Sequence, residues 1–272
     1  MATSPTRILL PFQPARDGFS FRNTFRWTEA DLSILGDRYR ALASSGVGVI
    51  GALGGGAVGG LLGAAGGAAG GGALGRAGVG EGLLRAAARR WPSFGLCGGM
   101  ALTAIDRWPA LSVPTSELRP EPMRPMLWRR QNRTIDASWA TFARTWARVR
   151  FGPGNVPYAP LAAELARELD RVEETLRAGR PALLGLVGDA PDPFALHQVA
   201  AFGLERRGPI SATLSVYDPN APGRTRHIQT HPAPAAGRTS LTTDMPTGRR
   251  AGGRSHISTR PGELSHLFRV DV

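Results

Sequence analysis

The sequence predicts an α+β fold in which helices come first along the chain and strands follow. Three segments, residues 97–107, 136–149 and 160–178, carry apolar side chains at steps of three and four, which is the spacing of one helix face. After the last of them the apolar pattern becomes that of strands, beginning with "PALLGLVG". This order favours a helical half packed on an antiparallel sheet rather than a doubly wound parallel sheet.

The first predicted helix runs from Cys97 to Arg107. Its apolar positions Met100, Ala104, Ile105 and Trp108 share one face. This helix places the only cysteine of the chain at a helix N-terminus.

The other two predicted helices have recognisable ends. Residues 136–149 repeat large apolar side chains, and Asp136 is the predicted N-cap. Residues 160–178 carry one leucine-rich stripe. Gly179 is the predicted C-cap, and Pro181 prevents the helix from continuing.

Strands are predicted from short apolar runs in the second half of the chain. They are "PALLGLVG", "ALHQVAAFGLE", "ISATLSVYD", "RHIQT" and, near the end, "HLFRV". "DPNAPGR" is a predicted turn because of its Pro, Asn and Gly content. Residues 232–262 are rich in Gly, Pro, Thr and Arg and are predicted to be a long loop, and "FSF" near the N-terminus alternates as a short strand does.

Composition narrows the classes of function. The 272 residues suffice for a sizeable core, the formal net charge is +12, and every basic residue is an arginine. Arginines cluster in residues 129–133, 144–150 and 249–254. The tryptophans near the first two clusters fit helix core positions, so we interpret the clusters as solvated basic faces and expect no nucleic-acid partner.

The compartment follows from cysteine usage and the N-terminus. A single cysteine excludes an internal disulfide, so nothing in the chain demands an oxidising environment. The opening "MATSPTRILLPFQPARDG" lacks the uninterrupted apolar run of a secretory signal peptide. We expect a cytoplasmic or membrane-associated protein.

Residues 46–82 form a glycine-rich island that holds 18 of the 36 glycines. One interpretation is a flexible linker or a loosely packed helical hairpin. The other is a glycine zipper, because a glycine recurs every four residues from Gly51 to Gly75, and such ridges associate in membranes. Membrane association would then use residues 46–75, which are long enough to cross a bilayer. Either way, we interpret the island as an insertion between residues 1–45 and the main part of the domain, residues 83–272.

Cys97 has two interpretations of its own. A lone cysteine among apolar residues is usually a small buried hydrophobe. At the start of a helix, however, unpaired N–H groups and the helix dipole favour the thiolate, which is the nucleophilic form. We expect Gly98 and Gly99 to leave these N–H groups uncrowded, and the Cys97 amide to donate to a developing oxyanion.

A nucleophilic thiol needs a base and a group that orients the base. His197 lies in "FALHQVAAFG", where a strand would hold its ring, and Asp218 ends the next predicted strand in "SVYDPN". Adjacent antiparallel strands bring the start of one beside the end of the next. Taken singly, His197 also fits a core histidine, and Asp218 is better explained as a turn residue, so the prediction depends on the two together. Asn220 is a weaker alternative as the orienting group.

"GLCGGM", "PALLGLVG…HQVAAFG" and "VYDPN", in this order, resemble the papain-like cysteine peptidase superfamily. They are most similar to the branch of bacteriocin-leader-processing peptidases and its uncharacterised bacterial relatives. The opening "FQPARDGFSFRNTF" also resembles the start of some of those relatives. The resemblance implies a papain-like fold with a Cys97, His197 and Asp218 triad, the cysteine on the helical half and the other two on the sheet half.

One feature departs from this family. Its oxyanion-hole side chain is a glutamine a turn or two before the cysteine, and "RRWPSFGLC" has no glutamine. Ser93 is the uncharged polar residue of that stretch, and Asn23 or Gln13 would serve if the N-terminal segment folds back. These three residues are the oxyanion-hole candidates.

The resemblance implies a cysteine-dependent hydrolase that acts on a peptide or protein by acyl transfer to Cys97, with His197 as base and no cofactor. The alternatives are a non-peptidase acyl transferase or deamidase on the same fold, or a catalytically silent membrane-associated binding protein built on the glycine zipper. His227 and His231 in "HIQTH" have zinc spacing only on a helix. This segment is a predicted strand without a carboxylate, so we expect no metal site.

Overall fold

The structure is a computed structural model. It describes residues 5–44, 82, 85–86, 88–89, 92–110, 113–151, 158–188, 197–233, 238–245 and 264–272. Almost all of the glycine-rich island lies outside these residues, so its interpretations as linker, hairpin or zipper stay predictions. Among the helices that the structure describes, none combines the length and the apolar character needed to cross a bilayer.

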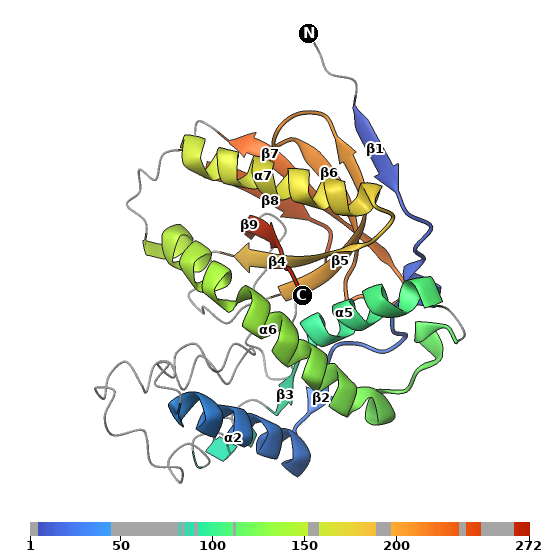
Figure 1. The fold of residues 1–272 in the computed structure, drawn as a ribbon, viewed down its shortest axis with the longest axis vertical. Helices are drawn as coiled ribbons and strands as arrows, with labels where there is room; N and C mark the ends of the chain where they lie inside the picture. Colours follow the sequence, from blue (N-terminus) through green and yellow to red (C-terminus); the bar gives the residue numbers. More distant parts are fainter. Residues whose placement is uncertain are drawn as a thin grey trace.

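One part of the molecule is an antiparallel sheet that curls on itself (Figure 1). As far as the structure describes the chain, the strand order is β1-β5-β4-β9-β8-β7-β6, and β5 also pairs with β6, so all strands except β1 close into a ring. The strands are β1 (Thr6–Leu9), β4 (Ala182–Gly188), β5 (His197–Arg206), β6 (Ala212–Tyr217), β7 (Thr225–Ala233), β8 (Arg238–Thr243) and β9 (Leu264–Arg269).

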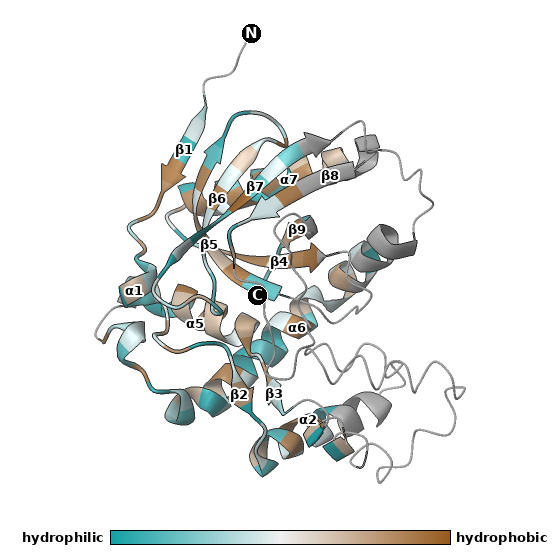
Figure 2. Cartoon of the chain, turned by 180° about the vertical axis from the view of Figure 1, so that it is seen from behind, coloured by the Kyte–Doolittle hydropathy of each residue, from teal (hydrophilic) through white to brown (hydrophobic). Residues whose placement is uncertain are grey.

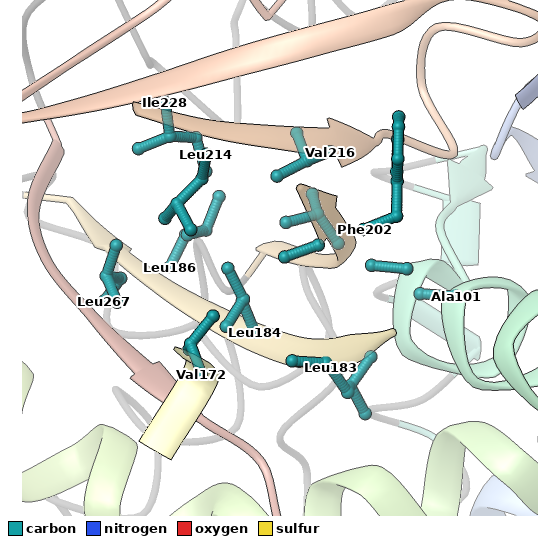
Figure 3. Close-up of a cluster of buried hydrophobic side chains, with 14 of the residues drawn as sticks. Ala101, Val172, Leu183, Leu184, Leu186, Phe202, Leu214, Val216, Ile228 and Leu267 are labelled. Atoms are coloured by element: carbon teal, nitrogen blue, oxygen red, sulfur yellow. The ribbon is translucent and has the colours of Figure 1, made fainter. Parts of the chain in front are cut away.

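The ring encloses the main apolar core. β4 and the first eight residues of β5 are buried almost throughout, which explains why both segments are nearly continuous apolar runs. Figure 2 shows β4 in the colours of hydrophobic residues. Figure 3 shows Val172 and Ala101, which belong to helices, in the same cluster as Leu184 and Leu214 of the strands. Helices therefore contribute side chains to the core of the sheet. Register shifts at Val187/Gly188 in β4 and between Ala201 and Gly203 in β5 help the strands to bend.

Helix α7 (Tyr158–Arg177) covers part of this sheet, as its leucine stripe predicts. Gly179 follows with φ +73°, and its amide donates to the Leu176 carbonyl oxygen at 3.0 Å. The predicted glycine C-cap is therefore confirmed. The structure as a whole confirms the coarser expectation of an α+β protein with an antiparallel sheet.

The helical half contains α5 (Cys97–Arg107), α6 (Pro120–Phe151), α2 (Glu29–Ser44) and the short pair β2 (Phe25–Arg26) and β3 (Ser93–Phe94). Its own apolar cluster includes Phe19, Phe25, Phe94, Met100 and Leu127. Helix α5 contributes Met100 to this cluster and Ala101 to the sheet core. It therefore lies where the two cores meet.

A buried ion pair fixes α2 on α6. The Asp31 carboxylate is 1% exposed and accepts hydrogen bonds from Arg124, Trp128 and Thr28. Burial raises the pKa of Asp31, but these donors outweigh it, so the pKa lies below its ordinary value. This cluster ties the N-terminal segment to the helix beside Cys97.

The predicted start of the second helix is wrong. The prediction begins at Asp136 as an N-cap, whereas α6 begins at Pro120 and Asp136 lies inside it. Proline is compatible with the first helical turn, where N–H groups have no helical partner, and only Pro125 lies further inside. The prolines therefore mark the beginning of this helix and not a loop before it.

Several short elements differ from the sequence predictions. "FSF" is not a strand, because the Phe19 amide donates to the buried hydroxyl of Tyr217 at 3.0 Å and the chain turns there. Residues 232–262, predicted as loop, contain β8 and the end of β7. In β8 the run "RTSLTT" buries Leu241 among threonines and a serine, and this weak strand signal is hidden among glycines and prolines.

Candidate active site

Cys97 is the first residue of α5, as predicted, and the helix range Cys97–Arg107 is confirmed. The residue before it, Leu96, is the N-cap and has no capping side chain. The first helical hydrogen bond runs from the Met100 amide to the Leu96 carbonyl oxygen at 2.9 Å. Cys97 is 7% exposed, so its surroundings are nearly dry. The thiol therefore lies where N–H groups of a first helical turn are concentrated.

His197 and Asp218 lie at the same end of two paired strands. His197 is the first residue of β5, and Asp218 directly follows β6, whose last residue Tyr217 is opposite Ala200. The His197 Nε2 atom lies 2.8 Å from Asp218 Oδ1. The side chains are 4% and 0% exposed. Two neighbouring antiparallel strands therefore hold the imidazole and the carboxylate together, as the sequence predicts.

The Asp218 carboxylate is held by its own turn. Its Oδ1 also accepts the Asn220 amide at 2.8 Å, the arrangement that favours Asp before a turn. The Asn220 Nδ2 atom is 3.5 Å from His197 Nε2, against 2.8 Å for Asp218. Asp218 is therefore the closer orienting group, and Asn220, the predicted alternative, supports it.

Cys97 and His197 interact across the boundary between the two halves. Burial lowers the pKa of His197, but the Asp218 charge and hydrogen bond, together with the Cys97 side chain, outweigh burial and raise the pKa to about 10. Nε2 is occupied by Asp218, and Nδ1 is buried without a hydrogen bond of conventional geometry among the described residues. Nδ1 is therefore the ring nitrogen that remains for the thiol.

Gly98 and Gly99 have a different role from the one predicted. We expected them to leave N–H groups open to a substrate. Instead, a Cβ on Gly99 would lie 2.2 Å from the Leu127 carbonyl oxygen, and one on Gly98 would lie 1.7 Å from Gln198 Oε1. The two glycines are therefore required by the close packing of α5 against α6 and β5. This packing sets how far Cys97 lies from β5.

A buried polar layer behind Cys97 was missed by the sequence analysis. The Gly99 amide donates to Gln131 Oε1 at 3.0 Å, and Gln198 Nε2 donates to Ser138 Oγ at 3.3 Å. All of these side chains are buried. Gln131 and Ser138 both belong to α6, and Gln198 follows His197 on β5. The layer links the helix of the thiol to the strand of the imidazole. The signal for Gln198 was a polar residue inside an apolar run.

Asn23 is the oxyanion-hole candidate that the fold brings to the site. Its Oδ1 accepts the Leu96 amide, one residue before Cys97, and its Nδ2 donates to Asn220 Oδ1 at 3.3 Å. The backbone N–H of Asn23 also donates to the Pro219 carbonyl oxygen at 3.0 Å. Asn23 therefore bridges the segment before the thiol and the turn that carries Asp218.

The other two candidates lie elsewhere. Gln13 is exposed at the start of α1 (Pro14–Asp17), where its backbone amide donates to Asp17 Oδ2 at 2.7 Å. Ser93 is in β3 and pairs with Arg26 of β2. Neither side chain has a hydrogen bond to Cys97, His197 or Asp218 in the part of the chain that the structure describes. Only Asn23 of the three is linked to the groups around the thiol.

Two pockets bear on the site. One, of about 660 Å³, lies beside the middle and end of α5, where Leu102 and Ile105 line it, and Val270 closes another side. It contains none of the three candidate catalytic residues. A second, of about 390 Å³, is lined by Asn220, whose Nδ2 atom lies 3.5 Å from His197 Nε2. Of these two pockets, the smaller is therefore the one with a lining residue in contact with the candidate site.

His227 and His231 are on β7 and lie apart along an extended strand. The His227 Nδ1 atom is 3.3 Å from Asp244 Oδ2, and this pair is half-exposed. Among the described residues there is no group of three side chains placed to hold a metal ion. Comparisons with protein-family models, with curated proteins and with solved structures found no match to this chain.

Proposed function

We propose that the protein is a cysteine-dependent hydrolase of papain-like architecture that acts on a peptide or protein substrate. The observation that carries the proposal is the placement of one helix-terminal thiol beside a buried imidazole whose second nitrogen is bound to a carboxylate. An inert buried cysteine needs neither partner. Three groups from three distant segments, arranged as nucleophile, base and orienting acid, match the requirements of thiol catalysis.

In the proposed reaction Cys97 attacks the carbonyl carbon of the substrate. The helix N-terminus and a protonated His197 favour the thiolate, which is the attacking form. The raised pKa of His197, about 10, agrees with a ring that carries a proton before the attack. A new S–C bond forms while the carbonyl π pair moves to the oxygen. The His197 proton then passes to the leaving amine as the C–N bond breaks.

Two donors are proposed for the developing oxyanion. One is the backbone N–H of Cys97, which lies in the first turn of α5. The other is Asn23 Nδ2, because an amide group has two hydrogens and its contact with Asn220 uses one of them. Asn23 would thus replace the glutamine of the family that the sequence resembles.

The second half of the reaction releases the acyl group. Neutral His197 removes a proton from water, water attacks the thioester carbon, and the C–S bond breaks to regenerate the thiolate and the imidazolium. Asp218 keeps Nε2 occupied during both steps, so that Nδ1 stays directed at the reacting sulfur. Asp218 accepts a hydrogen bond throughout and needs no proton transfer.

A peptidyl vinyl sulfone tests this proposal without knowledge of the natural substrate. The chain has one cysteine, so a mass increase of the intact protein reports Cys97 alone. We expect wild type to be labelled at neutral pH, His197→Ala to be labelled at least about tenfold more slowly, and Cys97→Ala not at all. The surface variant His227→Ala is the matched control, because it removes a histidine from another His–Asp pair.

The rival functions give different results. A catalytically silent protein leaves His197→Ala and wild type equally slow, which would overturn the proposal. A transferase or deamidase shares the labelling but releases ammonia or a transferred product from a glutamine-containing peptide. Mass spectrometry of such peptides after incubation therefore separates hydrolysis of the backbone from chemistry on a side-chain amide.

A further inference from the structure

The pocket beside Asn220 is strongly basic. It has a volume of about 390 Å³ and is lined in part by Arg22, Arg224 and Arg226. No lining residue carries a negative charge. Three guanidinium groups around a space of this size create a positive potential that attracts a small anionic group.

The three arginines are available to a ligand. Arg22 and Arg224 are exposed, and within the described ranges neither side chain has an ion pair or a hydrogen bond. Arg226 is partly buried; its Nη1 donates to the Asp244 carbonyl oxygen at 3.2 Å, while its Nε atom is buried without a partner. Arg124, by contrast, is paired with the Asp31 carboxylate. A guanidinium group that lines a pocket without a carboxylate partner has donors that a ligand oxygen can satisfy.

The pocket lies beside residues that contact the proposed active site. Asn220 lines it and lies 3.5 Å from the His197 ring. Arg22 directly precedes Asn23, the proposed oxyanion donor, and the Asn23 amide bonds to Pro219 at 3.0 Å. The loop of Arg22 and the turn before Arg224 therefore lie against each other, next to Asn23 and Asn220. A substrate bound at Cys97 would place its neighbouring residues near this pocket.

We propose that the pocket is a specificity site for a carboxylate of the substrate, either an acidic side chain next to the scissile bond or a free C-terminal carboxylate. This inference rests on the proposed function, because it takes Cys97 as the reacting group. Arg226 supplies a partly desolvated, anchored donor, and Arg22 and Arg224 supply charge at the rim. A carboxylate matches the fork of donors that a guanidinium group presents.

Two alkylating reagents that differ in one charge test the proposal directly. Iodoacetate carries a carboxylate and iodoacetamide does not, and both report on Cys97 through the mass of the intact protein. The quantity compared is the rate with iodoacetate divided by the rate with iodoacetamide. We expect this ratio, at about 0.1 M salt, to be about threefold lower in Arg22→Gln/Arg224→Gln than in wild type. Both side chains are exposed and unpaired, so the double variant should fold. Arg226→Gln should lower the ratio further.

The matched control is Arg177→Gln/Arg207→Gln, which removes the same charge at exposed positions. Arg207 directly follows β5, whose 10 residues place it about 30 Å from His197, beyond the Debye length. The control should keep the wild-type ratio. An equal ratio in wild type and in the pocket variant would overturn the carboxylate site. The ratio of the two alkylation rates stays measurable even when both rates are slow. The proposed function is tested separately, by the absolute labelling rate of Cys97 and by the decrease of that rate in His197→Ala.

Protection of Cys97 by short peptides distinguishes the two sources of the carboxylate. The probes are acetylated pentapeptides with a central Glu and an amidated end, a central Gln and an amidated end, or a central Gln and a free acid. Protection by the first but not the second supports an acidic side chain, and protection by the third supports a C-terminal carboxylate. Equal protection by inorganic phosphate alone would overturn peptide recognition, as would the absence of protection by either acidic peptide.

Discussion

His197 Nε2 and Asp218 Oδ1 lie 2.8 Å apart, and both side chains are almost completely buried. The pair stands at one end of β5 and β6, whose pairing brings the residues together from separate strands. The chain also contains a second His–Asp pair, His227 and Asp244, at 3.3 Å and half-exposed to solvent. Of these two pairs, the buried one interacts with Cys97. The two pairs therefore provide a matched comparison within one molecule.

Asp218→Asn should slow the alkylation of Cys97 by iodoacetamide at about pH 6 by about tenfold or more. The Asp218 charge is the largest of the effects that raise the pKa of His197, so its loss leaves a buried, neutral ring. A neutral ring no longer favours the thiolate. The rate is read from the mass of the intact protein over a pH series.

Asp244→Asn is the control and should leave the alkylation rate unchanged, because the Asp244 carboxylate lies 3.3 Å from His227 of β7, whereas His197 is bound to Asp218. A circular dichroism melt of each variant establishes that it is folded. Equal rates in wild type and folded Asp218→Asn would remove Asp218 from the proposed site.

The titration of His197 should also appear in the stability of the fold. The folded pKa is raised from 6.5 to about 10, so the protonated ring stabilises the fold fully below about pH 6.5, and this contribution is lost as the pH rises through the folded value. The difference in unfolding free energy between Cys97→Ala and Cys97→Ala/His197→Asn should shrink with pH above about 6.5. The limiting slope is about 1.4 kcal/mol per pH unit.

The Cys97→Ala background is used because it removes the titration of the thiol from the comparison. Asp218 is retained, so in Cys97→Ala the pKa of the His197 ring stays above its ordinary value. Urea unfolding at several pH values between about 6 and 9 measures the difference. A difference that is constant or grows with pH would show that the ring is neutral in the folded protein.

Gly99→Ala should destabilise the fold by about 1–3 kcal/mol or more. The added Cβ would lie 2.2 Å from the Leu127 carbonyl oxygen, which is backbone of α6 and cannot rotate away. Gly208→Ala is the control, because a Cβ there has only ordinary contact with Ser211 at 3.7 Å. Urea unfolding of both variants checks the prediction, and equal stability of the two would contradict the packing role.

The sequence was sufficient for the residues whose neighbours are local or one strand away. The cysteine helix, the helix of the leucine stripe with its Gly179 cap and the meeting of His197 with Asp218 all follow from short-range patterns. The polar layer could not be predicted in the same way. Gln131 bonds to Gly99, and Gln198 bonds to Ser138 of the same helix as Gln131, only because α6 begins before Asp136 and packs on α5.

The role of the two glycines shows the same limit. "CGG" at a helix start suggests open N–H groups, whereas the structure places backbone and side-chain atoms where Cβ atoms would lie. Close approach of two elements is a tertiary property, and a glycine in the sequence does not say which element approaches. Asn23 was a candidate only on the condition that the N-terminal segment folds back, and its contacts with Leu96 and Asn220 meet that condition.

Asn23→Ala should separate oxyanion stabilisation from thiol reactivity. Acylation of Cys97 by p-nitrophenyl acetate passes through an oxyanion, whereas alkylation by iodoacetamide does not. Loss of an oxyanion donor slows acylation by about 10²–10³. We expect Asn23→Ala to slow acylation far more than alkylation. Asn220→Ala is the control, because it breaks the same Asn23–Asn220 contact without removing the proposed donor. If both variants slow both reactions equally, Asn23 only positions the chain.

Replacing residues 46–82 with a short linker should leave the rest of the fold and the reactivity of Cys97 intact. The segments on either side are held together without the island: β2 pairs with β3, the Trp27 and Phe94 rings stack at 4.0 Å, and Arg85 pairs with Glu29 at 2.9 Å. The aromatic cluster of the helical half thus joins the chain before and after the replaced residues.

The geometry of α2 sets the length of the replacement. The helix has 16 residues and spans about 24 Å, so the chain that leaves its end must return over roughly this distance to reach Arg85 near Glu29. An extended chain covers about 24 Å with about eight residues, so a Gly/Ser linker of about twelve residues is sufficient. The gain from removing the rest is entropic, because a shorter loop costs less to close.

We expect the shortened protein to unfold cooperatively at a melting temperature equal to or above that of wild type, and to react with iodoacetamide at the wild-type rate. If the glycine zipper associates with membranes, wild type but not the shortened protein should float with lipid vesicles. The matched control exchanges residues 46–82 for a Gly/Ser sequence of the original length, which keeps loop length while removing the Gly/Ala pattern. A shortened protein that fails to fold while this control folds would mean that about twelve residues do not span the gap. Failure of both would mean that the island is part of the core, because Gly/Ala side chains would then be contributing burial that a solvated linker cannot replace.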